Sequence, residues 1–542
     1  MSVARLMQQR LLSVCAVCVL SLSGCDQSSM NGAESSSGMT IVRTTSGEVK
    51  GVVDDNILTF KGIPYAAPPL GERRWAPPQP MPAWEGVRDA SRFGSDCMQE
   101  PFPEDAAPLE TQPNEDCLVL NIWRKNKLVS EALPVLFWIH GGGFVNGGSS
   151  PRVYDGRAFA EQDIVFVSFN YRLGRFGFFA HPAVTAEAMG LLGNYGYMDQ
   201  IAALEWVRDN IANFGGNPND VTIMGESAGG FSVLNLMTAK QSQGLFHKAI
   251  IMSGGGRSIM GGMRSLRDSD DKHPSGEEIG MNFAALHGIE GEGAEALAAL
   301  RALSAEDVTL QLNLAQLFSP ETGPQTYVDG PMLDGEMMLS QPGRVIEGGE
   351  AARIPVLIGT THRDIGWLDA ETKEDIFSHF GDMADEVRKA YDPWGDLPME
   401  ALQAMLGADV AMHESAHFTA REITKYGHDA WIYRFSYVAE SKRAEWPSAP
   451  HASEIPFVFH TVKAKYGDAL TAQDARVAAN ALQAFSNFVT TGNPNSTGKN
   501  VWPTYQGAHG PIMEFDMNGD ATVKDDPWQA RLSVLTRFLD TQ

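Results

Sequence analysis

Positive charge is scarce in this chain of 542 residues. It carries 42 Lys and Arg against 67 Asp and Glu, which gives a formal net charge of −25. Proteins that bind nucleic acid need a basic surface, because cationic side chains displace the counterions of the phosphate backbone. The composition therefore excludes nucleic acid as an expected partner, and it is typical of a soluble, self-repelling surface.

The apolar run at the N-terminus is too short to cross a membrane. It spans residues 11–22 and follows Arg5 and Arg10, whereas a spanning helix needs about 20 residues. This pattern predicts a signal peptide over residues 1–24. The run ends in LSGC at 22–25, which resembles the lipobox of bacterial lipoproteins. We therefore expect an exported protein, periplasmic or at the cell surface, whose only membrane attachment is an acylated Cys25. Residues 25–38 would form a flexible tether. A plain signal peptide with an incidental cysteine is the alternative.

Cysteine is also scarce, with five in all. Three of them lie in the targeting segment, so only Cys97 and Cys117 remain for the mature protein. In an exported protein this pair indicates one disulfide, and two buried free thiols are the alternative.

Several ligand-binding motifs are missing. No histidine is spaced to join the two cysteines at a metal, and there is no H-E-x-x-H motif. No G-x-G-x-x-G or Walker loop is placed to hold a nucleotide. We expect neither a metal nor a cofactor.

From residue 39 to 542 the chain alternates apolar strand-like runs with helical stretches. Several runs are continuously apolar, which favours strands buried on both faces of a sheet. Apolar residues at spacings of three and four predict a helix from 198 to 214, ending at Gly215-Gly216. The alternation predicts an α/β fold with a largely parallel sheet covered by helices. The predicted strands are 133–139, 164–169, 221–224, 249–252, 354–358 and 431–435.

A glycine-rich, charged stretch interrupts this pattern after residue 254. We expect it to begin an insertion that runs to about 326 and caps the fold. A helical patch at 294–303 would form part of a lid.

One G-x-S-x-G motif, residues 225–229 (GESAG), follows the predicted strand 221–224 and precedes a helical stretch. A serine on such a tight strand-to-helix turn is exposed in strained backbone geometry, and the flanking glycines avoid collisions. The motif in this context predicts Ser227 as a nucleophile.

Three consecutive glycines follow the predicted strand 133–139, in the sequence HGGGF at 140–144. Nucleophilic attack on an ester carbonyl creates an oxyanion, which backbone N–H groups must stabilise. The N–H groups of Gly142, Gly143 and Ala228 are therefore the predicted oxyanion hole.

These motifs and others resemble the type-B carboxylesterase family, which includes cholinesterases and bacterial para-nitrobenzyl esterases. The resemblance covers residue 40 to the C-terminus and implies an α/β-hydrolase fold with an early disulfide that matches Cys97 and Cys117. The matching segments are 60–69 (FKGIPYAAPP), 115–123 (EDCLVLNIW), 138–144 (WIHGGGF), 193–230, 450–459 (PHASEIPFVF) and 485–495 (FSNFVTTGNPN).

The resemblance also implies the two partners of Ser227. His451, in PHASEIPF, matches the family's catalytic histidine. The family's acid is usually a glutamate, but here the matching segment 359–366 reads GTTHRDIG, so Asp364 is the predicted acid. Asp329 and Asp334 are the competitors, and they are better explained as turn residues. Glu226 resembles the family's buried acid beside the nucleophile, and we expect it to bond to a residue such as Ser253.

The sequence thus predicts a serine hydrolase that cleaves small carboxylic esters through an acyl-enzyme. The same groups would serve a carbamate, an amide or a lactone. A non-catalytic cholinesterase-like binding protein is the remaining alternative, and the intact serine and histidine argue against it. Choline-binding members carry a tryptophan within the early disulfide loop. Between Cys97 and Cys117 this chain has no Trp or Tyr, which argues against acetylcholinesterase activity.

Overall fold

The computed structural model describes residues 40–542, except for 103–104, 128–129, 188–190, 258–261, 271–272, 318–322, 367, 369, 497–500 and 508–509. The chain divides into the units Met1–Gly38 and Met39–Gln542. The predicted signal peptide, Cys25 and the tether lie outside the described residues. Within the described residues, no helix combines the length and the apolar character that a membrane span requires.

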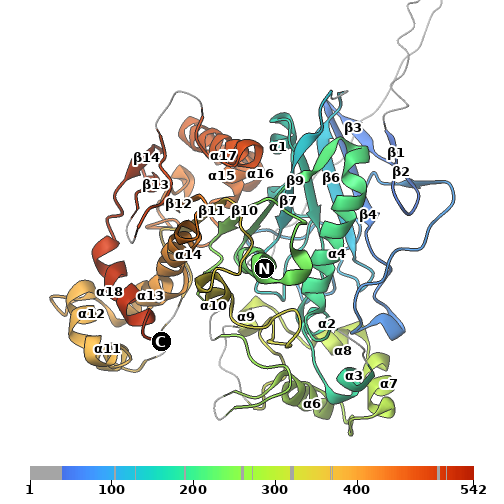
Figure 1. The fold of residues 1–542 in the computed structure, drawn as a ribbon, viewed down its shortest axis with the longest axis horizontal. Coiled ribbons are helices and arrows are strands. Elements are labelled where there is room, and N and C mark those ends of the chain that lie inside the picture. Colours follow the sequence, from blue (N-terminus) through green and yellow to red (C-terminus); the bar gives the residue numbers. More distant parts are fainter. Residues whose placement is uncertain are drawn as a thin grey trace, which may run out of the picture. The chain divides into compact units, whose positions relative to one another are not determined.

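An eleven-stranded sheet forms the centre of the second unit (Figure 1). Its strands lie in the order β14 (Ala521–Lys524), β13 (Ile512–Phe515), β12 (Ala430–Phe435), β11 (Val356–Thr361), β10 (Lys248–Met252), β9 (Gly216–Glu226), β7 (Leu133–Ile139), β8 (Val165–Phe169), β6 (Val119–Lys125), β4 (Ile57–Pro64) and β3 (Val52–Asp54). Neighbours from β13 to β8 pair in parallel, and the outer pairs are antiparallel. The six predicted strands are β7 to β12, so the predicted parallel sheet is confirmed.

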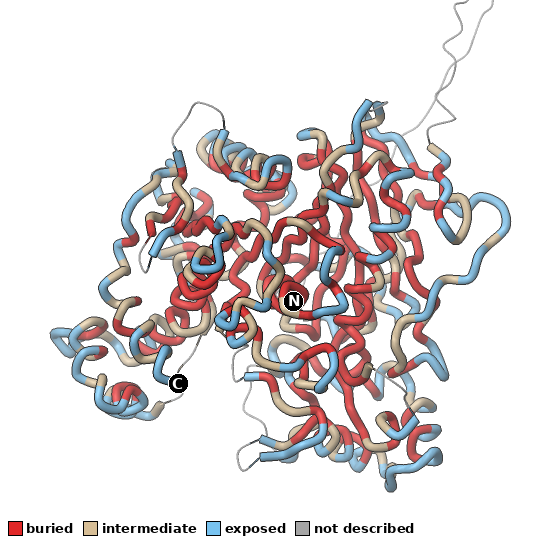
Figure 2. The backbone as a smooth tube through the Cα atoms, viewed as in Figure 1, coloured by how far each residue is buried: buried red, intermediate tan, exposed pale blue. Residues whose placement is uncertain are grey.

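Helices cover both faces of this sheet. In β7, Val135 and Phe137 belong to the core that includes α4 (Tyr195–Asn210), α5 (Ala228–Thr238) and α14 (Glu414–Lys425). Their neighbours Leu136 and Trp138 point to the other face. There they join the core of α1 (Arg157–Glu161), α15 (Ile455–Val458), α16 (Val462–Tyr466) and α17 (Ala472–Thr491). Figure 2 shows the central strands buried along their length. Burial on both faces explains why these strands are continuously apolar.

The segment between β10 and β11 consists, in its described residues, of five helices joined by loops. It contains α6 (Gly276–Leu286), α7 (Ala294–Ala302), α8 (Ala305–Thr309), α9 (Leu314–Leu317) and α10 (Pro342–Glu347). The predicted lid helix is α7, but it packs against α3 (Pro182–Glu187) and the 3₁₀ turn Gly71–Arg73. The short helix α9 instead contributes side chains to the cavity beside Ser227. The boundaries of a cap at about 254–326 stay a prediction.

A third, smaller core forms among α11 (Lys373–Ser378), α12 (Ala384–Tyr391), α13 (Met399–Ala408) and α18 (Gln529–Leu539). The π-helical turn Asp409–His413 links α13 to α14. The short helix α2 (Gly174–Gly177) precedes α3, and β1 (Ile41–Arg43), β2 (Glu48–Lys50) and β5 (Val87–Asp89) form a separate small sheet.

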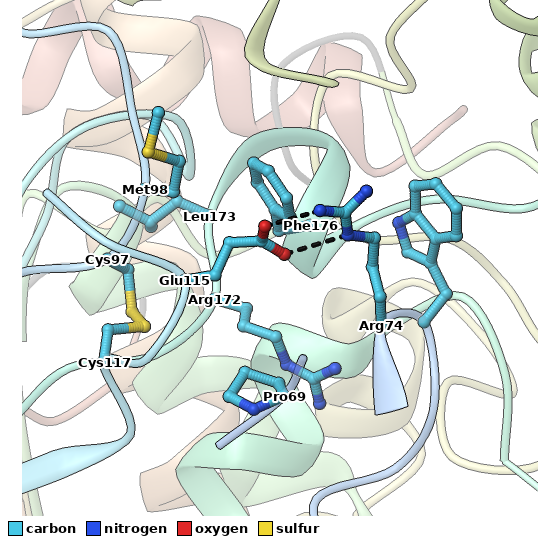
Figure 3. A pocket seen from close by; sticks show the side chains of 10 residues that line it. Pro69, Arg74, Cys97, Met98, Glu115, Cys117, Arg172, Leu173 and Phe176 are labelled. Atoms are coloured by element: carbon cyan, nitrogen blue, oxygen red, sulfur yellow. Dashed lines mark hydrogen bonds and ion pairs between the residues drawn. A yellow bond between two sulfur atoms is a disulfide. The ribbon is translucent and has the colours of Figure 1, made fainter. Parts of the chain in front are cut away.

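The predicted disulfide between Cys97 and Cys117 is present. Figure 3 shows the ion pair of Arg74 with Glu115 beside it. Nε of Arg74 donates to Glu115 at 2.9 Å, and Nη1 donates to the carbonyl oxygen of Leu303 at 2.7 Å. Arg74 thereby connects the disulfide loop, through Glu115, to the segment that follows α7.

Candidate active site

Ser227 lies at the sharp turn between β9 and α5. Its backbone has φ 58° and ψ −124°, a region that non-glycine residues rarely adopt and that stores strain. The Ser227 N–H donates to the carbonyl oxygen of Met252 at 3.0 Å. A Cβ atom on Gly225 would overlap the carbonyl oxygen of Gly229, and one on Gly229 would overlap that of Ile139. Close backbone packing therefore requires both glycines of the motif.

The glycine loop after β7 faces the same turn. Gly142 and Gly143 have φ values of 104° and 61°, which favour glycine. The loop is closed by Val145 and Asn146, whose N–H groups donate to the carbonyl oxygen of Gly142 at 3.1 and 2.9 Å. Among the described residues, the N–H groups of Gly142 and Gly143 have no hydrogen-bond acceptor. Both donors are thus available to a ligand.

Asp364 follows β11 and is fully surrounded by donors. Its Oδ2 accepts from Ser253 Oγ at 2.6 Å and from the Thr361 N–H at 3.0 Å. Its Oδ1 accepts from the Ile365 N–H at 2.9 Å and lies 2.6 Å from Nδ1 of His451. Burial alone would raise the pKa of Asp364, but the charge of His451 and these hydrogen bonds lower it to about 2. Asp364 is therefore an ionised partner of the histidine.

His451 has a second carboxylate on its other side. Nε2 of the ring lies 3.2 Å from Oε1 of Glu226, but neither atom has the alignment of a hydrogen bond. Burial would lower the pKa of His451, and the charges of Glu226 and Asp364 outweigh burial and raise it to about 10. In the described structure, no hydrogen bond joins Ser227 Oγ to the ring. Such bonds are often long in an empty site and tighten when substrate binds.

The expected bond between Glu226 and Ser253 is wrong. Ser253 donates to Asp364 instead, because β10 places it beside the end of β11, where its N–H donates to the carbonyl oxygen of Gly359 at 2.8 Å. Glu226 is buried, and burial raises its pKa to about 7 despite the nearby charge of His451. Glu226 is thus an electrostatic neighbour of the imidazole.

The competing aspartates lie in loops, and Asp334 has the backbone bonding of a turn residue, as predicted. Asp334 accepts the N–H groups of the three residues 336–338 and the side chain of Asn194. Asp329 has φ 60° and is bonded to Arg264 and Gln325. Neither is bonded to His451 in the described structure. Asp329 nevertheless lines the cavity beside Ser227, which its turn sequence did not indicate.

A buried histidine, His413, which the sequence analysis did not predict, bonds to the end of β11 just before Asp364. Nε2 of His413 lies 2.9 Å from the carbonyl oxygen of Thr361, and Nδ1 lies 2.8 Å from Oδ1 of Asp409. Arg531 of α18 pairs with the same aspartate. The π-helical turn directs His413 at the end of β11, and no local pattern in the sequence marks such a turn.

A cavity of about 540 Å³ brings the predicted residues together. Its lining includes Ser227, His451, Gly142, Gly143 and Ala228. The other lining side chains are mostly apolar, and they come from the loops after β7 and β11, the disulfide loop, α5, α9 and α15. They include Phe102, Phe144, Phe231, Leu314, Leu317, Ile365 and Ile455. Asp364 lies behind His451 and not in this lining. The arrangement suits an uncharged acyl or alcohol group placed beside Ser227.

Comparisons with known proteins agree with this geometry. The model of the carboxylesterase family matches residues 38–534. Fumonisin B1 esterase of Sphingopyxis macrogoltabida is 34% identical over 489 residues, which are 87% of this chain and 85% of that protein. Para-nitrobenzyl esterase of Bacillus subtilis (strain 168) is 34% identical over 501 residues, which are 90% of this chain and 96% of that protein.

A solved structure of a PNB esterase superimposes with a TM-score of 0.79 at 30% sequence identity. The match covers 92% of this chain and 99% of that one, and it confirms the predicted α/β-hydrolase fold. The chain belongs to the carboxylesterase family and is a serine hydrolase of carboxylic esters.

Proposed function

We propose that Ser227, His451 and Asp364 are the catalytic triad of this esterase. Support comes from the 2.6 Å contact between His451 and Asp364, next to a cavity that Ser227 and His451 share. His451 takes the hydroxyl proton of Ser227 as Oγ attacks the ester carbonyl. Asp364 holds the ring so that Nε2 faces the serine.

The oxyanion is stabilised by the N–H groups of Gly142, Gly143 and Ala228. When the tetrahedral intermediate collapses, the bond to the alcohol oxygen breaks and His451 returns its proton to the leaving alcohol. Water then attacks the acyl-Ser227 ester by the same route and releases the acid. Each such N–H group is worth on the order of 10²–10³-fold in rate.

The proposed nucleophile is tested by Ser227→Ala, with the exposed Ser378→Ala as the matched control. Hydrolysis of a para-nitrophenyl ester should fall on the order of 10⁶-fold in the first variant and stay at the wild-type rate in the second. A fluorophosphonate should label wild type and Ser378→Ala alone. Wild-type rates in Ser227→Ala would refute the assignment.

We also propose that the protein is exported and anchored through an acylated Cys25. The Cys97–Cys117 disulfide supports export, because such bonds persist in oxidising compartments and are rare in the cytosol. Cells fed an alkyne-bearing palmitate should yield a labelled, membrane-bound protein, and Cys25→Ala should abolish both properties. A wild-type protein without label would exclude the anchor and leave a plain signal peptide.

A further inference from the structure

The cavity beside Ser227 combines apolar walls with negative charge. Asp105, Glu226 and Asp329 line it, and no lysine or arginine is among its described lining residues. Oε1 of Glu226 is buried there without a hydrogen bond. Apolar walls have a low dielectric constant, so they strengthen the electric field that these charges exert on a group bound in the cavity.

Asp105 carries the least compensated of these charges. Its Oδ1 accepts the N–H of Ala107 at 2.8 Å, and it forms no ion pair in the described part of the chain. Lys465 is nearby, but its ammonium donates to the carbonyl oxygen of Ala106. Burial raises the pKa of Asp105, and the Ala107 bond and Lys465 offset this only in part. Asp329, by contrast, is paired with Arg264 at 3.1 Å.

We propose that this cavity selects esters by charge, with Asp105 as the main specificity determinant. Acyl groups that are neutral or cationic are accepted, and acyl groups that carry a carboxylate are rejected. When His451 is neutral, as the mechanism requires, a carboxylate in the cavity would face like charges and find no lysine or arginine among the described lining residues to replace its water shell. The proposal rests on the function proposed above, because the selected molecules are substrates of Ser227.

The experiment uses two pairs of para-nitrophenyl esters matched in shape. The monoglutarate is compared with the 5-methylhexanoate, in which an isopropyl group replaces the carboxylate. The 4-(trimethylammonio)butanoate is compared with the 5,5-dimethylhexanoate, in which carbon replaces nitrogen. Values of kcat/KM are measured at pH 8 with the full chain, and the readout is the charged-to-neutral ratio within each pair.

Wild type should hydrolyse the anionic ester at least about tenfold less efficiently than its neutral match, and the cationic ester at least as well as its match. In Asp105→Asn the anionic-to-neutral ratio should rise about five- to tenfold. Asp468→Asn removes the same charge from a fully exposed position that does not line the cavity, and it should leave both ratios unchanged. Because each ratio is internal to one variant, partial misfolding does not alter it.

Equal efficiency of wild type on the anionic and neutral esters would overturn the proposal, as would equal changes in Asp105→Asn and Asp468→Asn. Failure of the underlying function is distinguishable. It would appear as hydrolysis of the neutral esters by Ser227→Ala, whereas failure of charge selection alone leaves that hydrolysis dependent on Ser227.

Discussion

The carboxylate of Glu226 should set the pH at which the enzyme becomes active. In the proposed mechanism, His451 accepts a proton from Ser227 only as a neutral imidazole, so activity rises as pH increases through the pKa of the ring. The negative charge of Glu226 favours the imidazolium and raises that pKa. Glu226→Gln removes the charge and keeps the shape. It should lower the pKa and shift the acid limb of kcat/KM toward lower pH.

The size of the shift follows from the 3.2 Å separation of Oε1 and Nε2. Two unit charges at that distance interact by about 1.3 kcal/mol in water and about 5 kcal/mol at an effective dielectric constant of 20. These energies correspond to roughly 1 and 4 pH units. Burial raises the pKa of Glu226 to about 7, so its charge is present at the higher pH, about 10, where the ring loses its proton. His451 keeps 18% of its side chain exposed, so water weakens the interaction. We expect a shift of about 1 to 2 pH units.

The assay is the pH profile of kcat/KM for a neutral para-nitrophenyl ester, with the concentration of active sites titrated by a fluorophosphonate. Asp468→Asn is the control. It removes one negative charge from a fully exposed position that does not line the cavity, so it should leave the acid limb in place. An acid limb that does not move in Glu226→Gln, or that moves to higher pH, would refute the electrostatic reasoning.

Two further predictions concern the acid and the nucleophile turn. Asp364→Asn should lower kcat by about 10³- to 10⁴-fold, because the amide favours the wrong imidazole tautomer. Asp364→Glu should recover part of the loss, and an equal rate in Asp364→Asn and wild type would remove Asp364 from the triad. Gly229→Ala places a Cβ against the carbonyl oxygen of Ile139 and should cost about 1–3 kcal/mol of unfolding free energy in urea denaturation. Gly293→Ala, where a Cβ meets open space, is its control, and equal stability of the two variants would contradict the packing argument.

The central strands were predictable because burial on both faces leaves a continuous apolar run. Residues 133–139 were predicted as a strand and form β7. The outer strands β3 and β14 were not predicted. They contain four or fewer residues and are partly exposed, so they lack that signal. The order of the strands in the sheet could not be predicted from these patterns either, because it depends on packing between segments far apart in the chain.

Helix boundaries show a similar limit. The predicted helix 198–214 is α4, which ends at Asn210 and continues as the 3₁₀ turn Ile211–Phe214. Gly215 ends it in the left-handed conformation, with φ 84°. The glycine stop was readable from sequence. The change from α to 3₁₀ was not, because the buried Ile211 and Phe214 keep a spacing of three residues, which fits either helix type.

Site residues could be predicted from the sequence where the backbone geometry restricts which residue types fit. Ser227 and the glycine loop carry such constraints, since added side chains would collide with main-chain atoms. Asp105 and His413 are under no such backbone constraint. The sequence around each of them shows no motif, because their contacts are formed only when distant segments of the chain pack together. Resemblance to a family predicted His451 and Asp364, which lie 2.6 Å apart. The predicted partner of Ser253 was wrong, because its hydroxyl bonds to Asp364 and not to Glu226.

The surroundings of His451 explain how three buried carboxyl groups coexist with one imidazole. Burial penalises ionisation in all three, so hydrogen bonds and the charge of the ring decide which of them ionises. Asp364 accepts hydrogen bonds from four donors and is ionised, whereas burial holds the pKa of Glu454 well above its usual range. Glu226 faces the imidazole without an aligned bond, and its pKa of about 7 lies between theirs. In the proposed mechanism, a proton leaving Ser227 therefore enters a site whose permanent negative charge is fixed on the Nδ1 side of the ring. On the Nε2 side the negative charge varies with pH, and it is there that the ring must be neutral to act as a base.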